Sequence, residues 1–263
     1  MNQKQRRQKL LELVCTSNAS HIGSSLSVLD ILSAIFRHVN IEKIRQQAPD
    51  RDRIILSKGH SVSALYMLMN EYGLLSDDNL KTYLKDDSCL MGHSTKAVKC
   101  IEFSTGALGH GLPIATGIAL GLHNKKLGGH VHVIVGDGEL QEGSNWEAIM
   151  LIGQLQLGNI TIYVDKNGLG GSSPINDHCT LDPLIEKFEA FKIVAYSVKG
   201  NDVDDISSTL MDAITSHVPK ALICNTVKGS GIKFMEHDNV WHYRPVSKET
   251  LEASLRELNC SNL

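Results

Sequence analysis

Residues 131–170 read VHVIVGDGELQEGSNWEAIMLIGQLQLGNITIYVDKNGLG and decide the fold of this chain. Two apolar runs, 131–135 and 159–164, flank a segment whose apolar residues recur every three or four positions. This pattern predicts a strand, a helix and a second strand, joined by a right-handed crossover that makes the strands parallel. The turns after the two strands then meet at one edge of the sheet, where open α/β sheets bind ligands.

The two turns carry oxygen ligands and little side-chain bulk. Gly136-Asp137-Gly138 ends the first strand, and Asn167 follows the second. Mg²⁺ prefers hard carboxylate and carbonyl oxygens and usually keeps phosphate oxygens and water in its shell. The two glycines allow a diphosphate to approach the backbone amides closely. The turns therefore predict a magnesium and diphosphate site. The alternative interpretation is a tight glycine turn and an asparagine cap without a metal.

The composition is typical of one large α/β domain over residues 1–263. Hydrophobic residues make up 42% and charged residues 21%, and the length is sufficient for a full core. A formal net charge of −3 gives no reason to expect nucleic acid or an anionic membrane as a partner. The six cysteines are scattered without a C-x-x-C pair, and no apolar run suits a secretory signal or a membrane span. We therefore expect a soluble, cytoplasmic protein with reduced thiols.

Further elements are expected on both sides of the central unit. The predicted helices are 4–15, 28–37 with Ser27 as its cap, a helix from Ser61, a helix that the glycine-rich loop 104–112 opens and that runs through Ala119, 204–216 and an amphipathic helical tail at 247–263. Residues 51–60 are predicted to form a short strand that ends in a turn, and further strands are predicted at 191–196 and 221–226. The loops include 16–25, 74–101 and 172–183. His60 lies where the first of these strands gives way to a helix, and the free amides of a helix start favour an anion there.

The Gly136-Asp137-Gly138 turn, followed after one βαβ unit by Asn167, resembles the thiamine diphosphate motif. From about residue 7 to about residue 245 the chain is similar to the amino-terminal, diphosphate-binding half of transketolases. The pyrimidine-binding half that a single-chain transketolase carries is absent, so the chain resembles one subunit of a split transketolase. The resemblance implies a parallel-sheet thiamine diphosphate-binding fold with helices on both faces. It also implies thiamine diphosphate and Mg²⁺ as cofactors, with Ca²⁺ or Mn²⁺ able to replace the Mg²⁺.

The resemblance assigns roles to individual residues. The implied metal ligands are Asp137, Asn167 and the main-chain carbonyl of Leu169. The implied cofactor-binding residues are His60, Leu108, His110, Gly136, Asp137, Gly138, Glu139, Asn167 and His242. The implied catalytic residues, which face phosphate or substrate oxygens, are His21, His60, His93 and His242. Single-chain transketolases usually have Gln where His110 stands, and the sequence at 139–143 also resembles split subunits.

The expected reaction is that of a transferase of carbohydrate metabolism, moving a two-carbon ketol unit from a ketose or ketose phosphate to an aldose. In the family, the carboxylate that activates the aminopyrimidine ring lies on the pyrimidine-binding part. We therefore expect this chain to be inactive alone and to form a heterotetramer with two copies of each subunit. The partner carries most of the groups that select the sugar.

Other interpretations start from the same residues. The chain could be the cofactor-binding subunit of a 2-oxo-acid dehydrogenase or an acyloin-forming enzyme, relatives that lack the sugar-facing histidines. It could also be a non-catalytic cofactor-binding partner. Zinc is not expected, because spacings such as H-E-x-x-H are missing. The remaining histidines are expected to be solvent-facing or structural: His38, His123, His130, His132, His178, His217 and His237.

Overall fold

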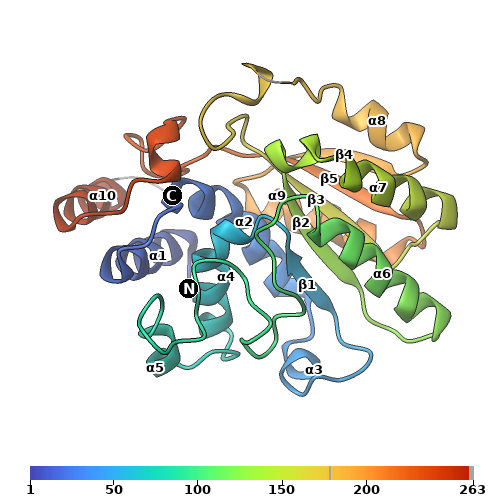
Figure 1. The fold of residues 1–263 in the computed structure, drawn as a ribbon, viewed down its shortest axis with the longest axis horizontal. Helices are drawn as coiled ribbons and strands as arrows, with labels where there is room; N and C mark the ends of the chain where they lie inside the picture. Colours follow the sequence, from blue (N-terminus) through green and yellow to red (C-terminus); the bar gives the residue numbers. More distant parts are fainter. Residues whose placement is uncertain (178, 261–263) are drawn as a thin grey trace.

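A computed structural model describes residues 1–177 and 179–260 of the chain. These residues form a five-stranded, all-parallel sheet in the order β1-β2-β3-β5-β4 (Figure 1). The strands are β1 (Arg53–Leu56), β2 (Val131–Gly136), β3 (Ile160–Lys166), β4 (Val194–Lys199) and β5 (Lys220–Asn225). The predicted α/β class with a parallel sheet is confirmed.

The central βαβ unit has the predicted form. Strand β2 pairs in parallel with β3, and Gly136 lies opposite Asp165 in the register. Helix α7 connects the two strands over Gly143–Leu155. Because the strands end level with each other, the turn at Asp137 and the turn at Asn167 lie at the same sheet edge.

Helices cover both faces of the sheet, as Figure 1 shows. Helices α6, α7 and α8 lie on one face; α2 and α9 lie on the other, with α4 beside α2 and with α1 and α10 farther out. The helices are α1 (Gln3–Ser17), α2 (Ile22–His38), α3 (Ile41–Arg45), α4 (Val62–Glu71), α5 (Asp77–Leu80), α6 (Gly111–Asn124), α7 (Gly143–Leu155), α8 (Leu184–Ala190), α9 (Val203–Thr215) and α10 (Lys248–Cys260). No helix among the described residues is long and apolar enough to cross a membrane.

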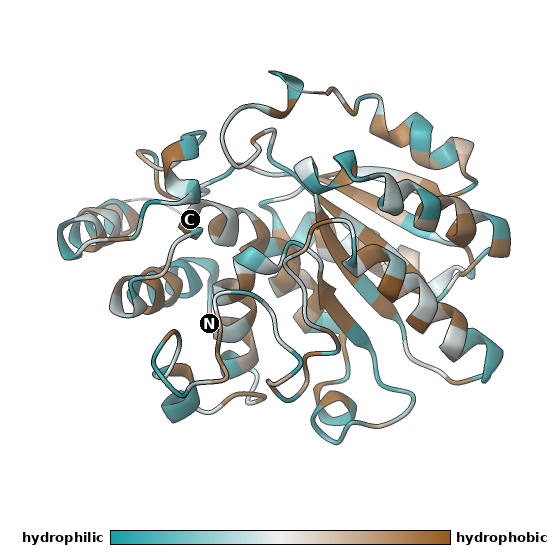
Figure 2. Cartoon of the chain, in the orientation of Figure 1, coloured by the Kyte–Doolittle hydropathy of each residue, from teal (hydrophilic) through white to brown (hydrophobic). Residues whose placement is uncertain are grey.

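Two apolar cores lie on the two faces of the sheet because strand side chains alternate. Ile134, Tyr163 and Leu222 belong to the core with α1, α2, α4 and α9. Val133 and Ile162, one position away on the same strands, belong to the core with α6, α7 and α8. Figure 2 shows apolar residues concentrated on the strands and hydrophilic residues along α1 and α10. The sheet is therefore a rigid support for the turns at its edge.

Several predicted boundaries were wrong. Helix α2 begins at Ile22, six residues before the predicted start, so the loop before it is much shorter than 16–25. Ser27 is not a cap: its hydroxyl is buried in the helix and donates to Asp165 at 2.6 Å. A run of small serines is typical of a loop. In this fold Ser24, Ser25 and Ser27 are buried in α2, and their small side chains allow the helix to pack closely against the sheet. The terminal residues of the predicted tail, 261–263, and His178 lie outside the described residues.

The remaining elements also differ in extent. Helix α8 was not predicted, and Phe191 caps its end instead of beginning β4, which starts at Val194. Helix α6 continues to Asn124, beyond the predicted end at residue 119. Helix α10 packs against α1. None of these differences moves the turns at the carboxyl ends of the strands.

Two histidines at the start of β2 are buried as part of the structure. His130 Nε2 lies 2.8 Å from the Thr161 hydroxyl, and His132 Nδ1 lies 2.9 Å from the Tyr163 hydroxyl. Burial lowers the pKa of His130 to about 4 and the pKa of His132 well below its usual value. The fold therefore requires both rings to be neutral.

We expect acid to destabilise the chain through these histidines. Their folded pKa values lie below the unfolded value of about 6.5, so the stability they contribute is present above about pH 6.5. It is lost as pH falls toward the folded values, and His130 alone accounts for on the order of 3 kcal/mol. Urea unfolding at about pH 7.5 and about pH 5 measures the loss. His130→Gln can still bond Thr161 but cannot titrate, so it should lose less stability; an equal loss in the variant contradicts the assignment.

Candidate active site

A cavity of about 300 Å³ opens at the carboxyl ends of the strands. It is lined by Ser24, Lys58, His60, Leu108, Gly136, Asp137, Gly138, Glu139, Gln141, Glu142, Asn167, Leu169, Gly170, Gly171, Ile175 and His242. Residues from segments far apart in the sequence thus meet at the predicted edge of the sheet.

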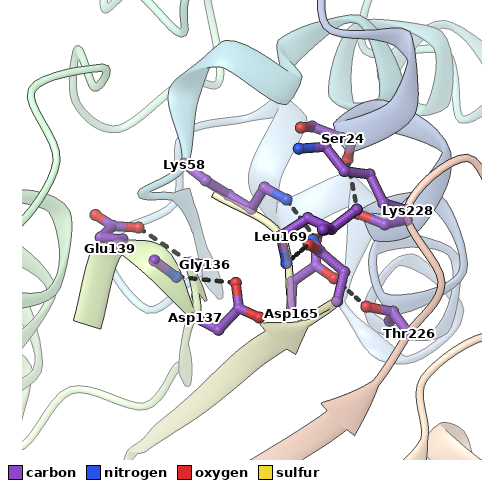
Figure 3. A network of polar contacts seen from close by, with 12 residues as sticks. Ser24, Lys58, Gly136, Asp137, Glu139, Asp165, Leu169, Thr226 and Lys228 are labelled. Atoms are coloured by element: carbon purple, nitrogen blue, oxygen red, sulfur yellow. Dashed lines mark hydrogen bonds and ion pairs between the residues drawn. The ribbon is translucent and has the colours of Figure 1, made fainter. Parts of the chain in front are cut away.

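Asp137, Asn167 and Leu169 all line this cavity. Figure 3 shows Asp137 and Leu169 near the buried Asp165 at the strand ends. The Asp137 carboxylate accepts backbone N–H bonds from Gly138 at 2.8 Å and from Gly168 at 2.6 Å. The Asn167 amide oxygen accepts the backbone N–H of Leu169 at 3.1 Å. Burial and the nearby Asp165 carboxylate raise the pKa of Asp137 to about 6. The buried carboxylate is thus an unfavourable anion that a cation at this position would stabilise.

These groups fit a magnesium ion bound together with a diphosphate. The described residues contain no cluster of three or more His, Cys, Asp or Glu side chains that could hold a metal alone. A shell of one carboxylate, one amide oxygen and one main-chain carbonyl leaves positions for phosphate oxygens and water, which is the coordination that Mg²⁺ favours. Asp137, Asn167 and Leu169 would supply the protein ligands, and Gly136 and Gly138 leave the approach open.

A second buried carboxylate, Asp165, was missed by the sequence analysis. It is fully buried at the end of β3 and forms an ion pair with Lys58. The hydroxyls of Ser27 and Thr226 also donate to it. Its charge is therefore neutralised inside the protein, and its contacts hold together the strand ends next to Asp137. In the sequence, Asp165 is simply the first residue of a turn, and nothing nearby indicates a partner more than one hundred positions away.

All four predicted catalytic histidines lie together at or beside the cavity. The His21 ring centroid lies 5.2 Å from that of His60, 6.0 Å from that of His93 and 5.0 Å from that of His242. The His60 and His242 rings are 5.3 Å apart. Gly106 makes room for His93, because a Cβ there would lie only 2.7 Å from the imidazole. The catalytic roles of these histidines stay a prediction.

Local structure explains how His21 and His242 meet. His21 adopts a left-handed conformation, with φ of 68°, immediately before α2. Its backbone N–H donates to the carbonyl of His242 at 3.0 Å. Burial, with smaller contributions from nearby cationic groups, lowers the pKa of His21 to about 4 and that of His242 to about 3. Burial also lowers the pKa of His60 well below its usual value. The three rings are therefore neutral at physiological pH.

Two of the predicted cofactor-binding residues, Leu108 and His110, differ in their position relative to the cavity. Leu108 lines the cavity and is partly exposed, as expected of a residue that contacts a ligand. His110 is exposed at the start of α6 and is not part of the cavity lining. Its Nδ1 lies 3.2 Å from the carbonyl oxygen of Leu108. Cofactor binding by Leu108 and His110 stays a prediction.

Glu139 faces the cavity but is bonded mainly to the protein. Its carboxylate accepts hydrogen bonds from the Ser57 hydroxyl, from the Gly109 N–H at 3.0 Å and from the Gly136 N–H at 3.2 Å. Burial raises its pKa. The geometry indicates that Glu139 fixes the two glycine-containing turns around the cavity, so any effect on the cofactor passes through them.

We expect Glu139→Gln to lower both stability and cofactor affinity. The NH₂ group of the glutamine would replace a carboxylate oxygen that accepts from Ser57, Gly109 or Gly136. Each buried donor that is left without an acceptor costs about 1–3 kcal/mol. Thermal unfolding of the chain and titration of the cofactor into the assembled enzyme measure the two effects. Glu186→Gln, an isosteric change at an exposed position on α8, is the control. Unchanged stability of the Glu139 variant would show that the carboxylate does not hold these turns.

Two other residues near the cavity carried no signal in the sequence. Lys228 is buried next to His242, and its ammonium is 3.0 Å from His242 Nδ1. Tyr243 is largely exposed, and its ring centroid lies 4.5 Å from that of His242 and 5.8 Å from that of His21. Lys228 and Tyr243 belong to the site through their tertiary contacts with the histidines, and no sequence motif marks them.

This combination defines a class of protein: a parallel α/β domain with oxygen-bearing side chains and glycine turns at the strand ends and a histidine cluster beside them. The family model described as transketolase, thiamine diphosphate binding domain, matches residues 3–260. The chain therefore belongs to the transketolase family and corresponds to its amino-terminal, thiamine diphosphate-binding part.

Relatives of similar length are transketolase subunits. The chain is 38% identical over 255 residues to an apulose-4-phosphate transketolase subunit of Actinobacillus succinogenes, covering 96% of this chain and 92% of that protein. It is 33% identical over 261 residues to the protein of the same name from Phocaeicola vulgatus, covering 98% and 93%. The predicted relationship to a split transketolase subunit is confirmed.

A solved structure shows how the chain compares with a longer enzyme. The transketolase of Campylobacter jejuni superposes with a TM-score of 0.88 at 26% identity, over 100% of this chain. The match covers only 44% of that enzyme. This chain thus has the fold of less than half of a longer transketolase.

Proposed function

We propose that this chain is the diphosphate-binding subunit of a Mg²⁺-dependent transketolase that works only with a separate pyrimidine-binding subunit. One observation carries the proposal: the oxygen-bearing side chains of Asp137 and Asn167 line the same cavity as His60 and His242, and the rings of His21 and His93 complete the histidine cluster beside it. A diphosphate on the metal then lies beside side chains that suit a polyhydroxylated substrate. The histidine cluster favours ketol transfer over the 2-oxo-acid dehydrogenase alternative.

The residues of this chain have distinct parts in the proposed reaction. Thiamine diphosphate, when bound, supplies the nucleophilic carbon and the electron sink for carbon–carbon cleavage. Asp137, Asn167 and the Leu169 carbonyl hold the metal. His60 and His242 bind phosphate oxygens and polarise the reacting carbonyl, while His21 and His93 orient donor hydroxyls and move the accompanying proton. General acid–base assistance of this kind is typically worth about 10²–10⁴-fold in rate.

The substrates follow from the family and from the names of the relatives. A ketose or ketose phosphate is the proposed donor, an aldose is the acceptor, and two carbons are transferred. The shared name of the two relatives from Actinobacillus succinogenes and Phocaeicola vulgatus includes a ketose phosphate, apulose-4-phosphate. We place the enzyme in the cytoplasm because all six cysteines, each within the described residues, are free thiols.

The proposed assembly contains two copies of this chain and two of its partner. Support comes from the relatives that are named as one subunit of a transketolase and from the longer transketolase, of which this chain matches less than half. The carboxylate that activates the aminopyrimidine ring is assigned to the partner. The partner is best sought as the product of the neighbouring gene.

Reconstitution tests the proposed function. Thiamine diphosphate is titrated with and without Mg²⁺ into this chain, into the partner and into their mixture, and ketol transfer from a ketose phosphate is followed in each. We expect tight Mg²⁺-dependent binding and turnover only in the mixture. Turnover by this chain alone would refute the split site. No cofactor binding in the mixture would remove the cofactor assignment.

A further inference from the structure

Lys228 is a buried lysine whose ammonium has no carboxylate partner among the described residues. It lies just after β5, and its side chain is almost completely buried. The ammonium contacts the Gly170 carbonyl oxygen at 2.8 Å, the Asn239 side-chain oxygen at 2.8 Å and His242 Nδ1 at 3.0 Å. These three contacts match the three N–H donors that a lysine ammonium offers. Lys228 therefore connects the turn after β3 to the segment that carries His242.

The contact with His242 determines where that ring carries its proton. A lysine ammonium has three donors and no lone pair, so it can only donate. His242 Nδ1 must then be the acceptor and carry no proton. In a neutral imidazole with an unprotonated Nδ1, the proton is on Nε2. The tautomer thus follows from the hydrogen bond that the other ring nitrogen makes.

Near neutral pH the Lys228 ammonium stays charged and the His242 ring stays neutral. Burial lowers the pKa of Lys228 only to about 8, so the ammonium persists at pH 7. Burial first, and then the charge on Lys228, lowers the pKa of His242 to about 3, so its ring stays neutral. The charged groups facing His242 are Lys228 and Lys58, and the neighbouring titratable rings are His21, His60 and Tyr243. No carboxylate among the described residues is in contact with this imidazole to favour a second proton.

The Nε2 side of His242 lies next to a glycine of the cavity wall. His242 and Gly171 both line the cavity, and the Cβ position of Gly171 is 3.7 Å from His242 Nε2. The rings of His21 and His60 lie 5.0 and 5.3 Å from the His242 ring. A donor at Nε2 thus lies at the cavity wall, on the ring nitrogen that Lys228 does not occupy.

We propose that Lys228 is a positioning residue that locks His242 in the Nε2–H tautomer, making His242 a fixed hydrogen-bond donor to an oxygen in the cavity. His242 then has no free lone pair with which to act as a general base. Proton abstraction is left to other histidines of the cluster, of which His21 is the nearest by ring distance. This catalytic consequence rests on the proposed transketolase function, whereas the tautomer itself does not.

The tautomer can be measured directly on the full chain. Long-range ¹H–¹⁵N correlation spectra of ¹⁵N-histidine-labelled protein at about pH 7 distinguish protonated from bare ring nitrogens, and His242→Asn identifies the His242 signals. We expect a neutral ring with the proton on Nε2 in the wild-type chain. In Lys228→Met the lock is removed, and the Nδ1–H form should appear. Lys233→Met, an exposed lysine on the same segment, should leave the His242 signals unchanged.

The results decide the proposal in both directions. A wild-type ring protonated on Nδ1 overturns it even if Lys228→Met fails to fold, and so does a Lys228→Met ring that keeps the Nε2–H form. In the assembled enzyme we expect Lys228→Met to lower kcat by about 10- to 100-fold, the usual effect of losing a partner that fixes a tautomer. Absence of ketol transfer in the wild-type mixture refutes the proposed function but leaves the tautomer measurement intact.

Discussion

Asp137→Ala should abolish Mg²⁺-dependent binding of thiamine diphosphate and, with it, the ketol transfer of the assembled enzyme. Asp137 is the one carboxylate among the proposed ligands, and the other two offer only neutral oxygens. Loss of groups that merely support metal ligands costs about 10- to 100-fold in affinity or activity, so removal of a ligand should cost more than about 100-fold. Cofactor titration at increasing Mg²⁺ concentration measures the loss. Undiminished Mg²⁺-dependent affinity in the variant would disprove the metal assignment.

Removal of the Asp137 charge should raise the stability of the chain without cofactor, although it impairs cofactor binding. The folded pKa of Asp137, about 6, lies above its unfolded value, so folding disfavours the anion. This penalty is on the order of 3 kcal/mol above about pH 6 and disappears as pH falls below about 4. Asp137→Asn removes the charge but leaves an NH₂ group facing a backbone N–H donor, and this unsatisfied contact costs about 1–3 kcal/mol of stability. We therefore expect a net gain of about 1 kcal/mol at neutral pH.

The control for both measurements is a carboxylate at the surface near the same strand end. Asp182 is exposed and forms an ion pair with Lys166 at 2.6 Å. Asp182→Asn should leave cofactor affinity unchanged and should not raise stability. A stability gain in Asp182→Asn equal to that of Asp137→Asn would show that the effect comes from net charge and not from burial.

His21→Asn should lower kcat/KM for ketol transfer by about 10²–10⁴-fold, the usual contribution of a general acid or base. His21 is neutral at pH 7 and lies nearest to the centre of the histidine cluster. Cofactor affinity should change little, because His21 is not among the residues that line the cavity floor. Steady-state kinetics of the assembled enzyme and cofactor titration together separate the two effects.

Asparagine is chosen because the backbone at residue 21 is left-handed, with φ of 68°. Asparagine tolerates this conformation, whereas an alanine there costs about 1–2 kcal/mol and mixes a folding defect with the catalytic one. His21→Gly is a second variant without that strain. His123→Asn, at an exposed position near the end of α6, serves as the control. Full activity in both His21 variants would exclude a catalytic role for this ring.

The fold around the central unit was predictable because its signals are local. Apolar periodicity indicated β2, α7 and β3, and glycine, aspartate and asparagine marked the turns between them. The order of the parallel strands then brings those turns together. The start of α2 was not predictable in this way. Its serines resemble a loop in sequence, and they are buried in a helix only because the sheet packs against them.

The supporting contacts of the site were beyond sequence reasoning for a related reason. The Lys58–Asp165 ion pair joins residues separated by 107 positions. Lys228 and His242 are only 14 positions apart, but an irregular segment separates them, and no spacing rule predicts that they touch. Motifs identified the groups that would face the ligand; the groups behind them become visible only in three dimensions.

The contacts of Asp165 have a consequence for where such an enzyme can be divided into separate polypeptides. Its carboxylate binds Ser27, Lys58 and Thr226, so one buried charge is satisfied by donors from both ends of the domain. Loss of a partner from a buried ion pair costs about 3–5 kcal/mol. A break anywhere between residues 27 and 226 puts Asp165 and at least one of its donors on different polypeptides. The two polypeptides must then associate before these contacts can form. A break after Thr226 keeps Asp165 and its three donors on the same polypeptide. An enzyme encoded by two genes is therefore best divided between its domains and not within this one.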